Sequence, residues 1–201
     1  MQEVFRPMPR GTAGLLFIMA KEAAKRAKQN AGTLGEGLEV MTTVILCAVV
    51  AEAAINEICE WFELHHQRPP FSIPNGLPFE FERLELRQKW LLLPIVARQR
   101  TFDRSAEPWQ SFEALVELRN HIVHLKRRAL PKKVTGLLMS KLGAGNLNHD
   151  VAKWACATMS SMFPALTALI DPPERWIDLL WLWTPRHFAP GLSTPGWPDR
   201  P

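Results

Sequence analysis

The stretch EGLEVMTTVILCAVVAEAAINEICEWFELH, residues 36–65, decides the fold. Its apolar side chains recur at the spacing of a helix, and neither glycine nor proline interrupts it between Val40 and Phe62. The stretch therefore predicts a long helix at the centre of the fold. The apolar positions are Val40, Met41, Val44, Ile45, Val49, Ile55, Ile58 and Phe62.

Shorter helices are expected on both sides of this helix. Gly32 and Gly35 predict a turn before it, and the prolines within residues 68–76 exclude helix after it. No run of alternating apolar and polar residues indicates a strand, so we predict an all-α fold, a helical bundle. The other helices are expected at about residues 12–30, 79–97 (kinked or broken at Pro94), 109–128, 132–142 and 148–170.

The sequence suggests a division into three parts. Residues 1–35 are expected to form an N-terminal helix and turn, residues 36–170 the helical domain, and residues 171–201 a tail rich in tryptophan and proline. Five prolines after Thr184 predict a poorly ordered end. The tryptophans before them are expected to dock on the bundle or on a partner subunit.

The charge of the chain is unevenly distributed. The net charge of +4 is mild, but residues 119–149 contain seven lysines or arginines and no acidic residue. Such a stretch is typical of a phosphate-binding surface, and equally of a solvated helix end favoured by the helix dipole. The candidate RNA-binding residues in it are Lys126, Arg127, Arg128, Lys132 and Lys133.

Cysteine usage and hydropathy favour a cytoplasmic protein. Cys47, Cys59 and Cys156 are far apart in sequence and form no CxxC pair, which indicates buried free thiols in a reducing compartment. The apolar run from Met41 to Ala51 stops at Glu52, well short of the roughly 20 residues that span a bilayer. We therefore expect no membrane segment.

Two charged residues are predicted to lie on buried helix faces. On a helical wheel, Arg119 falls at the centre of an apolar stripe, and Glu52 shares a face with apolar residues of the long helix. A buried guanidinium is costly unless an anion or a solvated cavity meets it. We therefore predict that the two helices pack with Glu52 near Arg119, either as a phosphate-orienting pair or as a structural salt bridge.

Asn120 and His124 are four residues apart and lie on one flank of the same helix. An imidazole can move a proton near neutral pH, and an amide can hold an imidazole or a phosphate oxygen. A neighbouring guanidinium can stabilise the charge that develops on a phosphate. RNA cleavage without a metal needs these chemical groups.

The spacing Arg119-Asn120-x-x-x-His124 resembles the R-polar-x(3)-H signature of HEPN-domain ribonucleases of the RiboL-PSP type. Residues 112–118 and 126–128 on either side are similar to the usual context of that helix. So are residues 51–57 and the Lys89-Trp90 pair. The resemblance covers about residues 36–170.

The resemblance implies a helical homodimer in which the motif helices of two subunits make one composite cleft. It also implies metal-independent RNA cleavage to a 2',3'-cyclic phosphate, in a toxin–antitoxin, phage-defence or RNA-processing setting. His124 would then be the general base or acid, and Arg119 would bind the phosphate. Asn120 would position His124 or the substrate, with Glu52 as a supporting residue. No cofactor is implied, and an antitoxin or another protein is a candidate partner.

Other functions stay open beside this one. Many helical domains of this kind are non-catalytic dimerisation or scaffold modules. A metal site at His121 and His124 would lack a third ligand at a suggestive spacing, and the basic stretch has no helix-turn-helix or finger pattern that indicates DNA binding. No glycine-rich phosphate loop or nucleophile elbow is present in the sequence.

Overall fold

The computed structural model describes residues 12–66, 83–124, 136 and 147–170, and every statement on structure below concerns these residues. They form helices and no strand, which confirms the all-α prediction. The prediction of one long central helix is also confirmed. The helices are α1 (Thr12–Gln29), α2 (Leu34–His66), α3 (Leu86–Arg98), α4 (Trp109–Val123) and α6 (His149–Ile170).

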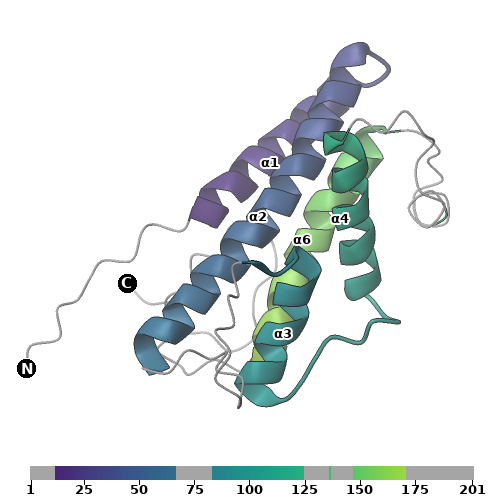
Figure 1. The fold of residues 1–201 in the computed structure, drawn as a ribbon. Helices are drawn as coiled ribbons and strands as arrows, with labels where there is room; N and C mark the ends of the chain where they lie inside the picture. The colour runs from purple at the N-terminus through teal and green to yellow at the C-terminus, as the bar shows by residue number, and fades with distance from the viewer. Residues whose placement is uncertain (1–11, 67–82, 125–135, 137–146, 171–201) are drawn as a thin grey trace, which may run out of the picture.

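Helices α1 and α2 form an antiparallel hairpin, and α6 packs against both of them (Figure 1). The hairpin turns at Gly32, whose φ of +79° is accessible to glycine at little cost. Helices α3 and α4 pack against α6 and also contact α2. The long helix therefore touches every other helix named above.

Helix α3 begins later than its sequence pattern predicts. Glu85 is extended, and its N–H donates to the Gln88 side chain at 3.0 Å, so the helix starts at Leu86 instead of Phe79. Pro94 lies inside α3 without ending it. Helix α4 ends at Val123, and the predicted extension to Arg128, the predicted helix at 132–142 and the tail lie outside the described residues, Gly136 excepted.

Aromatic side chains fill the core where α3, α4 and α6 meet. Trp90 is fully buried, and its ring centroid lies 5.2 Å from that of Phe112 and 5.9 Å from that of Phe163. Its indole N–H donates to the Ala51 carbonyl of α2 at 3.1 Å. Trp90 thus fixes α3 against the helix that carries Glu52.

By length and composition alone, α2 could cross a membrane between Leu34 and Cys59, a segment that contains an 18-residue window with a mean hydropathy of 2.0. This apolar segment is longer than the run that ends at Ala51, on which the sequence argument relied. Half of that window is buried inside the bundle, and the buried residues of α2 share one core with those of α1 and α6. Packing in this core accounts for the buried part of the apolar composition of α2.

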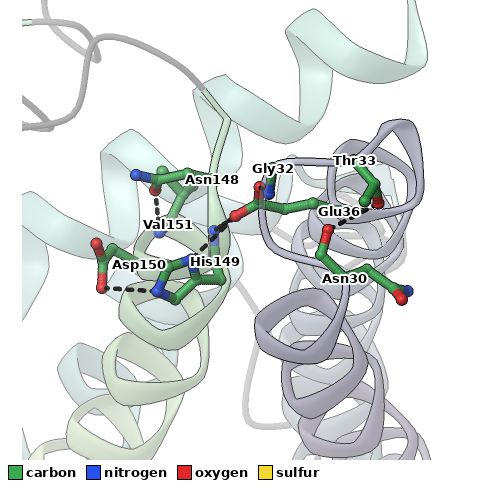
Figure 2. A network of polar contacts seen from close by, with 8 residues as sticks. All are labelled: Asn30, Gly32, Thr33, Glu36, Asn148, His149, Asp150 and Val151. Atoms are coloured by element: carbon green, nitrogen blue, oxygen red, sulfur yellow. Dashed lines mark hydrogen bonds and ion pairs between the residues drawn. The ribbon is translucent and has the colours of Figure 1, made fainter.

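A polar network ties the turn between α1 and α2 to the start of α6 (Figure 2). One Glu36 carboxylate oxygen accepts from the Gly32 N–H at 2.7 Å, and the other lies 2.8 Å from the His149 backbone nitrogen and 2.9 Å from its Nδ1. The Asp150 carboxylate lies 3.9 Å from Nε2 of His149. The hydrogen bond from Gly32, followed by those from His149, lowers the pKa of the Glu36 carboxyl below its ordinary value.

Glu36→Gln is therefore expected to reduce the dependence of stability on pH. Because the folded pKa of Glu36 is lowered, its carboxylate stabilises the fold above the ordinary glutamate pKa of about 4.3, and this contribution is lost as the pH falls through the folded value. Urea unfolding from about pH 6 down to about pH 3 should show the wild type losing its advantage over the variant. A constant difference across that range would contradict the prediction.

Candidate functional site

A pocket of about 500 Å³ lies where the middle of α2 meets the start of α3 and the end of α4. Its wall is part apolar and part charged, which suits a ligand that carries both characters. The apolar lining residues are Ala48, Val49, Leu84, Leu86 and Val116. The polar ones are Glu52, Glu85, Arg87, Arg119 and Asn120.

Arg119 and Asn120 reach this pocket from α4 as a hydrogen-bonded pair. Arg119 Nη1 donates to Asn120 Oδ1 at 2.9 Å, and both residues are half-buried. The apolar stripe predicted on α4 is buried as far as Val116, whereas Val123 at its end is 44% exposed. Arg119 therefore sits where the buried stripe opens to the pocket. The amide here holds the guanidinium, a role that the sequence did not assign to it.

The predicted packing of the two helices, with Glu52 near Arg119, is confirmed, since both residues line the same pocket. No ion pair joins the two among the described residues. The Glu52 carboxylate forms its ion pair with Lys89 of α3, whose side chain is 3% exposed. Lys89 Nζ also donates to Asn56 Oδ1 at 3.1 Å. A buried ammonium needs nearby acceptors more than a half-buried guanidinium beside a solvated pocket does, and Lys89 takes the carboxylate for that reason.

The sequence reasoning assigned no role to Arg87, which reaches the pocket from α3. Its Nη2 donates to the Glu113 backbone carbonyl at 3.0 Å, which holds the guanidinium in place. Its Nε is buried and has no hydrogen-bond partner among the described residues. Lys89 lies two residues further along and shares a helix face with the apolar residues Leu86, Trp90 and Leu93, which was the available signal that α3 carries charge inward.

The charges around the pocket favour an anion. Lys89 neutralises Glu52. The other charged groups that line the pocket are the two guanidiniums of Arg87 and Arg119 and the single carboxylate of Glu85. Arginine presents a planar fork of donors that fits phosphate oxygens. The arrangement can therefore hold a phosphate group between α3 and α4.

His124 does not line this pocket. It is the exposed C-terminal cap of α4, and its N–H donates to the Asn120 carbonyl at 3.1 Å. It lies one turn beyond Asn120 on the same flank, about 6 Å further along the axis. The five basic residues predicted to bind RNA, from Lys126 to Lys133, lie outside the described residues. The described part of the chain contains no group of three or more side chains that could hold a metal ion.

Glu52→Ala is expected to destabilise the fold by about 1–3 kcal/mol, because it removes a charged acceptor from the buried Lys89 ammonium. The value is set below that for a fully buried pair because the Glu52 side chain is 41% exposed. Glu52→Gln keeps an oxygen acceptor and should cost less. Urea unfolding of both variants measures this, and equal losses would contradict the specific need for an acceptor at this position.

Comparison of the chain with protein-family models, with curated proteins and with solved structures found no match.

Proposed function

We propose that the protein is a metal-independent endoribonuclease of the HEPN type, which cleaves RNA by attack of the 2'-hydroxyl on the adjacent phosphate. The observation that carries the proposal is the Arg119–Asn120 pair at the edge of a pocket with excess positive charge, with His124 exposed one turn along the same flank. The family resemblance of this motif supports the same assignment.

In this reaction the chain has two tasks. Arg119, with Arg87 beside it in the pocket, supplies donors for the phosphate oxygens as negative charge develops on them. His124 supplies the proton transfer that activates the 2'-hydroxyl or releases the leaving oxygen. A histidine at an exposed helix end can approach a bound strand without displacing the core.

The proposal includes a homodimer. Within one chain, His124 lies outside the pocket that Arg119 lines, so a phosphate held there is not in contact with the imidazole. Facing motif helices from two subunits would bring His124 of one chain towards the pocket of the other. The setting we propose is a cytoplasmic toxin–antitoxin or phage-defence system, in which a partner protein covers the cleft.

The test is cleavage of a mixed RNA pool in the presence of EDTA by the wild-type protein, with its oligomeric state measured by light scattering. We expect a dimer and products that end in 2',3'-cyclic phosphate and 5'-hydroxyl groups. Cleavage that EDTA abolishes would contradict the metal-independent mechanism. Intact RNA after incubation with folded dimer would contradict the enzyme assignment.

A non-catalytic interaction module is the second candidate. Its support is an apolar face on α1, where Leu15, Ile18 and Met19 are spaced as neighbours on one side of the helix and are between 48% and 62% exposed. Exposed apolar side chains in one stripe are typical of a surface that another helix covers. This function predicts that Leu15→Glu disrupts self-association or partner binding. It also predicts that neither the wild type nor the variant cleaves RNA.

A further inference from the structure

Two cysteines that are far apart in the sequence are neighbours in the structure. The Sγ atoms of Cys47 on α2 and Cys156 on α6 lie 3.9 Å apart, close enough for a hydrogen bond between thiols. Cys47 is completely buried, and Cys156 is partly exposed. The sequence indicated buried thiols without a disulfide, and no disulfide joins the three cysteines, but their spacing gave no sign of this pair. Cys59 lies twelve residues beyond Cys47, about 18 Å along the helix.

We propose that Cys47 and Cys156 form a reversible disulfide site that is oxidised by a hydroperoxide. The inference rests on the contact between α2 and α6 and is independent of the proposed ribonuclease activity. It adds a covalent link between two helices that pack side by side in the core (Figure 1).

The geometry requires only a local adjustment. A disulfide has a sulfur–sulfur distance of about 2.05 Å, so the two sulfurs must approach by nearly 2 Å. Rotation of the partly exposed Cys156 side chain can provide much of this movement while Cys47 stays in the core. The helices that carry the two thiols are already in contact, so the two sulfurs start as neighbours.

The two thiols are suited to different roles. The hydrogen bond from Cys47, together with the positive charge of Lys21 on α1, lowers the pKa of the Cys156 thiol, and burial opposes this shift. The same hydrogen bond and burial raise the pKa of Cys47. The more acidic and more exposed sulfur therefore reacts first with an oxidant, and the buried one resolves the product.

The reaction balances with one hydroperoxide. The Cys156 thiolate attacks an oxygen of the peroxide, the O–O bond breaks, and the thiol proton leaves with the departing oxygen as water or an alcohol. The Cys47 sulfur then attacks the resulting sulfenic acid, forming the S–S bond and breaking the S–O bond, and its proton leaves as part of a second water. The two sulfurs together lose two electrons, which the peroxide gains. An external thiol reverses the step by disulfide exchange.

The test is treatment of the folded protein with one equivalent of hydrogen peroxide, followed by thiol titration in denaturant and peptide mass spectrometry. We expect the three free thiols to fall to one, that of Cys59, and a peptide that links Cys47 to Cys156. Dithiothreitol should restore all three. The matched control is Cys59→Ser, which should lose both of its thiols under the same treatment.

Cys47→Ser tests whether the two thiols react as a pair or independently of one another. In this variant, Cys156 should still form a sulfenic acid, which dimedone traps, and no link within the chain should follow. If the buried substitution prevents folding, Cys156→Ser at the partly exposed position serves instead and should leave Cys47 reduced. Disulfides only between chains, a link that involves Cys59, or three unreacted thiols in the wild type would each overturn the proposal.

Discussion

His124→Ala is expected to lower RNA cleavage by about 10²- to 10⁴-fold, the usual loss when a general acid or base is removed. The prediction follows from the proposed function, in which the exposed imidazole at the end of α4 transfers the proton. Stability should barely change, because the His124 side chain is exposed and the contact that ends the helix uses its backbone N–H. Initial cleavage rates and thermal unfolding of the two proteins measure both parts.

His121→Ala is the matched control, because it removes an imidazole from the same helix three residues earlier. His121 is half-buried and lines no part of the pocket, so cleavage should be retained. Equal loss of activity in both variants would indicate that an intact helix end matters more than the proton transfer. Full activity in His124→Ala would remove this residue from the mechanism.

The helices could be predicted closely where local signals are strong. The Gly32 turn and the apolar spacing of residues 36–65 place α1 and α2 within two residues of their observed ends. The start of α3 was predicted too early because the apolar and charged residues before Leu86 are compatible with a helix. The extended Glu85 and its contact with Gln88 override that local preference.

The site was harder to predict because it depends on which helices meet. The helical wheel correctly predicts that Glu52 and Arg119 lie near one another, since both residues line the same pocket. It could not show that Lys89 of α3 is the ion-pair partner of Glu52. The contact of Cys47 with Cys156 likewise depends on the packing of α2 on α6, which has no signature in either local sequence.

Trp90→Ala is expected to destabilise the fold by about 3–5 kcal/mol, the usual cost of emptying the site of a large buried aromatic side chain. Its ring packs among Phe102, Phe112 and Phe163, so no single neighbour can fill the space. Urea unfolding followed by circular dichroism measures the loss. A loss below about 2 kcal/mol would contradict a rigid aromatic core.

A comparison of two conservative variants separates the packing of Trp90 from its hydrogen bond. Trp90→Phe removes an indole N–H that donates to the Ala51 carbonyl, whereas Trp109→Phe removes a buried indole N–H that has no acceptor among the described residues. Both indoles are fully buried, so the loss of ring volume is similar. Because an unpaired buried donor is itself destabilising by about 1–3 kcal/mol, Trp109→Phe should cost less than Trp90→Phe. The reverse order would mean that the hydrogen bond from the Trp90 indole to the Ala51 carbonyl adds nothing to the stability of the fold.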